Sequence, residues 1–291
     1  MIAEVDGEAG GRAGAPLAAL LALAATGIGA MALWHWSDRA ADRAEMARLL
    51  ALQPAEPPAF DPAMVAGLPE PARRFLTWAI LPGTPLRSVA RIEMAGRFSM
   101  GDARDAQDYK MTATQVLAAP EGFVWAMRAG RGEMMLSGSD SARWTRFWLT
   151  GLVPVARMGG DDDHRRSAFG RYVAEAVFWT PAAVLPGPGV TWDAAGPDTA
   201  RMTMTLGELS QAVDIVLDAA GRPLEVAFQR WSNENADRVF RWQPFGGVLS
   251  DHREVDGFRV PLRVEAGNHF GTEDYFPFFD VRVTSIVWPE R

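Results

Sequence analysis

The segment at residues 247–270, GVLSDHREVDGFRVPLRVEAGNHF, constrains the fold more than any other stretch of the chain. Its Asp256-Gly257 pair suits a two-residue hairpin turn, because both positions need a positive φ that Gly adopts freely and Asp tolerates. After the turn, Phe258, Val260, Leu262 and Val264 alternate with charged residues or proline. A period of two predicts a strand with one buried face. The segment therefore predicts an antiparallel hairpin.

Short alternating runs of the same kind recur along most of the chain. Strands are also predicted at residues 89–100, 109–117, 123–129, 133–138, 142–155, 190–193, 199–206, 211–217, 224–228 and 276–288. Most connections are too short for parallel crossovers, so the sheet is expected to be antiparallel. A sheet of about ten strands must twist and curl. We therefore expect a mainly β (α+β) domain at residues 61–291, a half-barrel covered by helices at 62–80 and 165–183.

The N-terminal region contains an apolar stretch at residues 16–36 with no formally charged side chain when His35 is neutral. At about 1.5 Å per residue, this stretch spans about 30 Å, the thickness of a bilayer core. Trp34 and Trp36 suit the interfacial belt. A cleaved signal peptide fits poorly because the preceding residues are acidic. We expect a transmembrane helix, and the alternative is a buried Ala-rich helix of a soluble protein.

The regions on either side of residues 16–36 carry no packing pattern. Residues 1–15 are rich in Gly and Ala and are expected to be disordered. Residues 37–60 are expected to form a helical and then Pro-rich linker. More arginines follow the apolar stretch than precede it. The positive-inside rule then favours a cytoplasmic globular domain on a single-pass protein of a bacterial inner membrane, and the side stays unresolved.

Composition excludes several classes of site. The chain has no cysteine, which excludes disulfides, thiolate zinc sites and cysteine nucleophiles. The net charge of −7 and the absence of a basic run argue against nucleic acid as a partner. The four histidines show no HExxH spacing, and Asp161-Asp162-Asp163-His164 is better interpreted as a solvated loop, so no metal is expected. No nucleotide-binding fingerprint is present, so no cofactor is expected.

The predicted hairpin places two charges among apolar residues. In its register Arg253 faces Val260 and Asp251 faces Leu262, so both charged residues share the apolar face. A charge on such a face is costly unless it is paired. Asp251 and Arg253 are expected to pair with each other or with the helix at 165–183, or to orient the polar end of a ligand. A register shifted by one residue would turn both outward.

The predicted helix at 165–183 supplies the other candidate side chains. Arg171 and Glu175 have the i, i+4 spacing of a surface pair, and Tyr172 and Trp179 could border the mouth of a cavity. The candidate ligand-binding residues are Asp251, Arg253, Val260, Leu262, Arg171, Tyr172, Glu175 and Trp179. His252 is the candidate acid–base group, although a strand residue stacked near Pro261 is preferred. No catalytic residue is assigned.

Several phrases resemble a bacterial family known as a domain of unknown function. They are LPEPARRFL (68–76), GLVPVAR (151–157), RYVAEAVFWTPAAVLPGPGVTW (171–192) and GVLSDHREVDGFRVPLRVE (247–265). The resemblance covers about residues 61–288, and many members look membrane-anchored. It departs at Asp251-His252-Arg253, where Asp-Tyr-Arg is expected. The family implies no activity.

A more distant resemblance is to the lipoprotein-carrier fold of LolA and LolB. There too a late strand carries a turn followed by proline, here Asp256-Gly257 and Pro261. That resemblance implies a curled antiparallel sheet and a helical lid around an apolar cavity, and it implies a fold more than a function.

These observations lead to an expected function and two alternatives. The abundance of Met and Trp suits a pocket for varied apolar shapes, although an ordinary β core has the same composition. We expect a membrane-anchored binding protein for an apolar or amphipathic, lipid-like molecule, without covalent chemistry. One alternative is an interaction or scaffold module of the cell envelope that uses an open sheet edge. The other is a hydrolase that uses His252 with Asp251 or Glu254.

Overall fold

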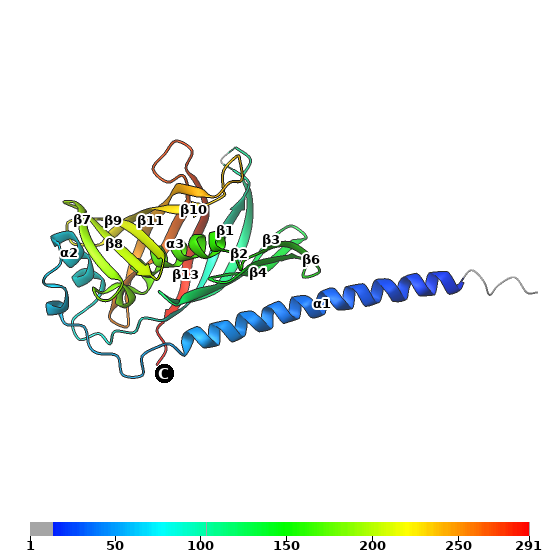
Figure 1. Cartoon of the computed structure of the whole chain (residues 1–291), viewed down its shortest axis with the longest axis horizontal. Helices are drawn as coiled ribbons and strands as arrows, with labels where there is room; N and C mark the ends of the chain where they lie inside the picture. The colour runs from blue at the N-terminus through cyan, green and yellow to red at the C-terminus, as the bar shows by residue number, and fades with distance from the viewer. Residues whose placement is uncertain (1–13, 103, 291) are drawn as a thin grey trace, which may run out of the picture.

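The computed structural model describes residues 14–102 and 104–290, and a single sheet of thirteen strands dominates them (Figure 1). Every neighbouring pair is antiparallel, in the order β6-β5-β4-β3-β2-β1-β13-β12-β11-β10-β9-β8-β7. The strands are β1 Ala90–Met100, β2 Gln107–Ala118, β3 Gly122–Arg131, β4 Met134–Ser141, β5 Thr145–Leu149, β6 Val153–Met158, β7 Val190–Gly196, β8 Thr199–Leu206, β9 Leu209–Leu217, β10 Pro223–Ser232, β11 Arg241–Val255, β12 Phe258–Asn268 and β13 Phe276–Val287. The antiparallel sheet expected from the short connections is confirmed.

The number of strands and their curvature differ from the expectation. Residues 142–155 were expected as one strand, but β5 and β6 are separate, because Thr150 and Gly151 take φ values of 51° and 73° and form a turn. The sheet is open at its edge strands β6 and β7 and is not strongly curled, so its curvature is smaller than the expected half-barrel requires. The chain passes from β6 to β7 through α3 (Asp162–Trp179), a helix of about 27 Å that lies across the sheet.

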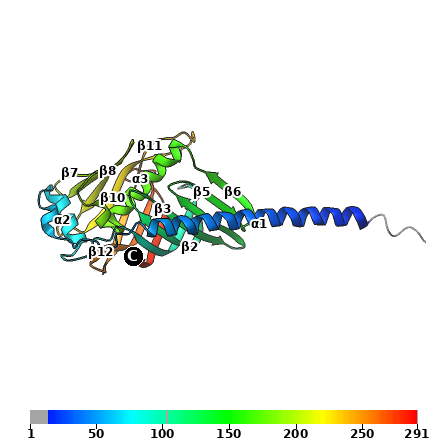
Figure 2. The same ribbon diagram turned by 60° about the horizontal axis from the view of Figure 1, so that its bottom comes forward.

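Two helices cover what we call the inner face of the sheet. α3 contacts β9, β10, β12, β2 and β3, and Figure 2 shows it lying across the strands. The shorter α2 (Glu70–Ala79) contacts β7, β8 and β12 beside the short 3-10 helix η1 (Pro62–Val65). A second short helix, η2 (Pro181–Val184), follows α3. The main hydrophobic core lies between these helices and the inner face.

The start of α3 explains the acidic run that precedes it. The side chain of Asp161 accepts a hydrogen bond from the backbone N–H of His164 at 2.7 Å, which caps the helix. Asp162 forms an ion pair with Arg165, and Asp163 accepts a hydrogen bond from the indole of Trp231. The helix therefore begins three residues before the predicted position, within the acidic run. No group of three or more His, Cys, Asp or Glu suited to a metal occurs in the described residues.

The long helix α1 (Gly14–Leu50) lies against the opposite, outer face of the sheet along its C-terminal half. There Leu49 packs against Val116 and Val124 in a small second core. Asp38 accepts hydrogen bonds from the guanidinium of Arg157 at 2.6 Å and from the indole of Trp148 at 2.9 Å. The helical part of the expected linker is therefore attached to the sheet.

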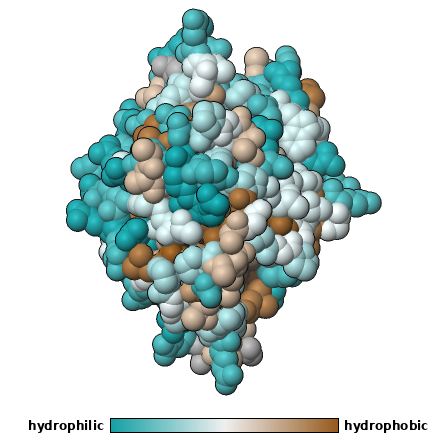
Figure 3. Space-filling model, turned by 90° about the vertical axis from the view of Figure 1, so that its left-hand side faces the viewer, coloured by the Kyte–Doolittle hydropathy of each residue, from teal (hydrophilic) through white to brown (hydrophobic). Residues whose placement is uncertain are grey.

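The N-terminal half of α1 extends away from the domain (Figure 1). Among the described residues, α1 is the helix that is long and apolar enough to cross a membrane, and its most apolar window is entirely unburied. Residues 1–13 of the expected disordered tail lie outside the described residues, whereas Gly14 and Ala15 begin α1. At the other end of the domain, around α2 and β7, the surface is mostly hydrophilic with scattered apolar side chains (Figure 3).

The hairpin predicted at residues 247–270 consists of β11 and β12. Its turn is Asp256-Gly257, with φ values of 50° and 84°, and Arg253 pairs with Val260, as predicted. The predicted register continues past Asp251, because Ser250 pairs with Arg263 on one side of it and His252 pairs with Pro261 on the other. Asp251 therefore lies opposite Leu262, as predicted, but it takes a φ of 51° and forms no pair in the ladder. The local distortion interrupts the ladder at this residue without a change of register.

Candidate functional site

A cavity of about 90 Å³ lies between α3 and the inner face of the sheet. Residues of α3 form one wall, and residues of β1, β3, β10, β11, β12 and β13 form the others. Eight of its sixteen lining residues are aromatic: Phe98, Trp125, Phe178, Trp179, Phe228, Phe245, Phe278 and Phe279. Large rings that meet edge to face leave irregular gaps, so the aromatic crowding explains why a hollow persists under the helix.

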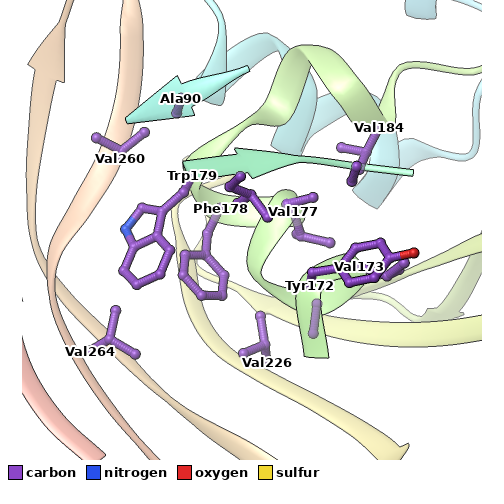
Figure 4. Close-up of a cluster of buried hydrophobic side chains, with 14 of the residues drawn as sticks. Ala90, Tyr172, Val173, Val177, Phe178, Trp179, Val184, Val226, Val260 and Val264 are labelled. Carbon is purple, nitrogen blue, oxygen red and sulfur yellow. The ribbon is translucent and has the colours of Figure 1, made fainter. Parts of the chain in front are cut away.

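The lining is graded in depth. Trp179, Val226 and Val264 are at most 4% exposed and form the deep end. Figure 4 shows Trp179 between Val260 and Val264, with Phe178 toward Val226. The indole N–H of Trp179 donates to the carbonyl oxygen of Pro261 at 3.2 Å, which fixes the ring. Phe278, Phe279, Phe98 and Phe245 are partly exposed and form the mouth. A ligand in this cavity would meet apolar surface at the deep end.

Three lining residues are charged: Arg171, Glu175 and Arg230. Arg171 donates through Nη1 to Asp140 Oδ2 at 2.6 Å and through Nε to Glu175 Oε1 at 2.9 Å. Its side chain and those of both carboxylates are only 15–16% exposed. Burial opposes the charge of Arg171, but Glu175 and Asp140 outweigh that effect and raise its pKa. Arg171 is therefore a structural cation held by two acids.

Arg230 has a different environment at the mouth of the cavity. It extends from β10, and its guanidinium carbon lies 4.9 Å from the centre of the Phe245 ring. Its Nε is buried and has no hydrogen-bond partner among the described residues. Burial, and then the charge of Arg171, lower the pKa of Arg230. A partly buried guanidinium with an unsatisfied Nε and no acid partner is costly, so this side chain is the feature of the site that most needs an explanation.

The candidate residues predicted on the helix divide between the cavity and the core. Arg171, Glu175 and Trp179 line the cavity. Tyr172 is 4% exposed and donates its hydroxyl to the carbonyl oxygen of Pro120 at 3.0 Å, outside the cavity lining. Burial raises the pKa of Tyr172 above its ordinary value. That any of these side chains contacts a ligand stays a prediction.

The candidates predicted on the hairpin lie apart from the cavity lining. Val260 is fully buried in the main core, and Leu262 packs against that core. Asp251 and Arg253 do pair with each other, one of the two pairings expected, at 3.0 Å. They do so toward solvent, because Asp251 has a φ of 51° and forms an ion pair with Arg282 of β13. The expected placement of these two charges on the apolar face is therefore wrong.

A second hollow of about 260 Å³ lies between α2 and the hairpin. It is lined by Trp78, Ala220, Arg222, His252, Arg253, Glu254 and Arg259. Each of the three arginines has an acid within 4 Å. The His252 ring stands edge-on to Trp78, with the ring centres 5.4 Å apart. The strand role preferred for His252 agrees with its pairing to Pro261, and catalysis by His252 stays a prediction.

Sequence reasoning missed Arg230, although a signal for it exists. In the strand predicted at 224–228, Leu224, Val226 and Phe228 occupy alternate positions, and Arg230 is the next residue of that alternation. A charge that continues an apolar period is the mark of an inward-facing cation. The aromatic residues of β13 were also missed, because in FPFF (276–279) apolar residues occupy both faces and the period is lost.

Comparison with known proteins gives one family and distant structural similarities. A putative outer membrane lipoprotein-sorting protein domain from Vibrio parahaemolyticus has a TM-score of 0.36 and 10% identity, over 69% of this chain and 85% of that one. A LolA superfamily protein from Nitrosomonas europaea has a TM-score of 0.37 and 9% identity, over 74% and 90%. These similarities are too distant to carry an argument about function.

None of the curated proteins matches the chain. The family model described as "Family of unknown function (DUF6544)" matches residues 58–281, which include α2, α3 and almost all of the sheet. The chain therefore belongs to this family of unknown function, DUF6544.

Proposed function

We propose that this chain is a membrane-anchored protein that holds an apolar or amphipathic small molecule in the cavity beneath α3, without covalent chemistry. The observation that carries the proposal is the aromatic cavity between α3 and the inner face. Burial of apolar ligand surface supplies about 25 cal/mol per Å² before the costs of binding. Pockets that enclose a whole drug-sized ligand measure about 300–1,000 Å³. The smaller volume here suits one end of a ligand, such as a ring or the end of an acyl chain.

The anchor is the apolar half of α1. A signal peptide that is removed after export would compete with this assignment. Trp34, however, stands edge-on to Trp148 with the ring centres 5.4 Å apart, and its ring lies 4.4 Å from the guanidinium of Arg157. Removal of the apolar half together with Trp34 would uncover Trp148, which is 1% exposed. These contacts favour a helix that is retained.

The test uses the full chain purified from membranes, with extraction of bound molecules and mass spectrometry. Ala266 lines the cavity, and Ala266→Phe would fill it. Ala95→Phe is the matched control, because Ala95 pairs with Thr112 and Arg282 on the outer face. We expect a co-purifying molecule in the wild type and in Ala95→Phe, and its loss from Ala266→Phe. Equal recovery from all three proteins, or recovery from none, would refute the proposal.

The scaffold alternative has one observation in its favour. β6 is an edge strand, and Val153, Val155 and Met158 on it are more than half exposed. Such an edge can accept a strand from another chain. Val155→Lys would block that pairing and leave the cavity intact. The scaffold function would be favoured if a membrane protein co-purifies with the wild type but not with Val155→Lys, while the recovery of any small molecule is the same from both proteins.

A further inference from the structure

The charges at the cavity are unequally satisfied. Glu175 accepts from Arg171 through Oε1 and from the side-chain amide of Gln115 through Oε2, at 2.9 and 2.5 Å. Asp140 accepts from Arg171 through Oδ2 and from the Thr145 hydroxyl through Oδ1, at 2.6 and 2.5 Å. All four carboxylate oxygens therefore have a donor. Neither acid forms a hydrogen bond or an ion pair with a second guanidinium.

Arg230 is the arginine of this cavity that makes no direct contact with either acid. Within residues 14–102 and 104–290 no carboxylate lies within 4 Å of it, and no hydrogen bond from it is formed. A guanidinium carries five N–H donors in a planar fork that matches a carboxylate or a phosphate. Hydrogen bonds between such ionised groups are stronger than neutral ones. An anion is therefore the partner that would best match the free donors of Arg230.

The position of Arg230 separates the two ends of a ligand. The side chain is partly exposed and stands beside Phe245 at the mouth, whereas Trp179 and Val264 close the deep end. A molecule that enters tail first would place its apolar end against Trp179 and its polar end at Arg230. A fully apolar molecule would leave the guanidinium unpaired, and a cation would be repelled by it.

We propose that the ligand is an amphipathic anion whose carboxylate or phosphate is bound by Arg230 at the mouth while its hydrocarbon end occupies the aromatic cavity. This proposal rests on the proposed function and adds the chemical class of the ligand. A fatty acid and a lipid with a phosphate head group share this chemistry.

The test is photo-crosslinking in membranes that carry the full chain. Three probes share one long chain with a photoactivatable diazirine and differ in the end group: a fatty acid, an alkyl phosphate and a fatty alcohol. Labelled peptides from α3 and β10–β12 are quantified by mass spectrometry at a pH where the acid probe is ionised. The labelling yield of each probe is compared between variants and not between probes, so that differences in how strongly the probes partition into the bilayer do not affect the comparison. The variants are Arg230→Gln, Arg230→Lys and the control Arg241→Gln, an exposed arginine of β11 paired with Asp237.

We expect Arg230→Gln to reduce labelling by the preferred anionic probe about tenfold, with alcohol labelling unchanged. The probe with the larger loss identifies the head group. Arg230→Lys should keep most of the labelling, and Arg241→Gln all of it. If Arg230→Gln also loses alcohol labelling, the protein is damaged, and the acid-to-alcohol ratio in Arg230→Met, which removes the charge and is expected to be at least as stable as the wild type, decides instead.

Two results would contradict the proposals separately. Anionic labelling of the cavity that is unchanged in Arg230→Gln would overturn the anion and leave the binding function standing. No cavity labelling by any probe in the wild type would overturn the binding function itself.

Discussion

The two faces of the sheet bury charge in different ways. On the outer face, Asp38 of α1 meets two guanidiniums and an indole N–H, and Asp42 accepts from the hydroxyl of Ser139. On the inner face, Arg171 is equally well paired, but Arg230 is not. On the outer face, the buried acids that join α1 to the sheet all have donors. On the inner face, a cavity remains beneath α3, and Arg230 at its mouth has no acid partner.

The largest expected effect comes from breaking the paired charge of the inner face. Arg171→Met would leave Asp140 and Glu175 partly buried without their shared cation. We expect a loss of about 3–5 kcal/mol in the free energy of unfolding, measured by urea denaturation. Arg201→Met is the control, because Arg201 and Asp214 form an exposed pair, and about 1 kcal/mol or less should be lost there. Equal losses in the two variants would mean that the inner network is no more than a surface pair.

Breaking the corresponding charge of the outer face should have a smaller, local effect. Asp38→Ala would remove the acceptor of Arg157 and Trp148. We expect a loss of about 1.5–3 kcal/mol, concentrated in α1. Hydrogen exchange of the amides at residues 34–50 should rise, while exchange in β10–β12 stays unchanged. Arg39→Ala, a change at an exposed neighbour, should leave both regions unaffected, and a rise in both variants would contradict the role of Asp38.

The two arginines of the cavity should respond in opposite directions. In protein freed of bound molecules, Arg230→Met replaces an unpaired, partly buried charge with an apolar chain of similar length. We expect the free energy of unfolding to stay the same or to rise by about 1 kcal/mol, in contrast to Arg171→Met. A loss as large as that of Arg171→Met would show that Arg230 has a structural partner, and it would remove the contrast between the faces.

The smallest expected effect concerns pH and the second hollow. Burial, and then the charge of Arg222, lower the pKa of His252. The unfolded chain therefore takes up a proton near pH 6.5 that the folded protein resists, so this residue favours folding above that pH and opposes it as the pH falls. His252→Gln should flatten the decline in stability between neutral and mildly acidic pH. A pH profile parallel to that of the wild type would contradict the assignment.

The sequence was most informative where structure is local. The hairpin turn at Asp256-Gly257 follows from two adjacent residues that tolerate positive φ, and the register next to it was correct. The left-handed backbone at Asp251 was not predicted, because Asp251 is paired with Arg282, which lies thirty-one residues away on another strand. The separation of β5 from β6 was missed because Thr150 is a poor signal for a left-handed turn.

The candidate site shows the same limit. The alternation of β10 contained the inward position of Arg230, but only the fold shows that Glu175 and Asp140 are already occupied by other donors. Likewise, residues 37–50 were expected to be the helical part of a linker, and their attachment to the sheet was not predicted. The arginine partners of Asp38 in this segment, Arg146 and Arg157, lie more than a hundred residues further along the chain.

The continuity of α1 has a consequence for how cargo would move. Its 37 residues form one helix of about 55 Å, without a proline between residues 17 and 50. With the apolar half in a bilayer and the other half attached to β2 and β3, the domain has no flexible tether. It could neither travel between membranes nor swing far above one. A molecule bound beneath α3 would therefore have to enter from, and leave to, the bilayer that holds α1, or be exchanged with another protein at that bilayer.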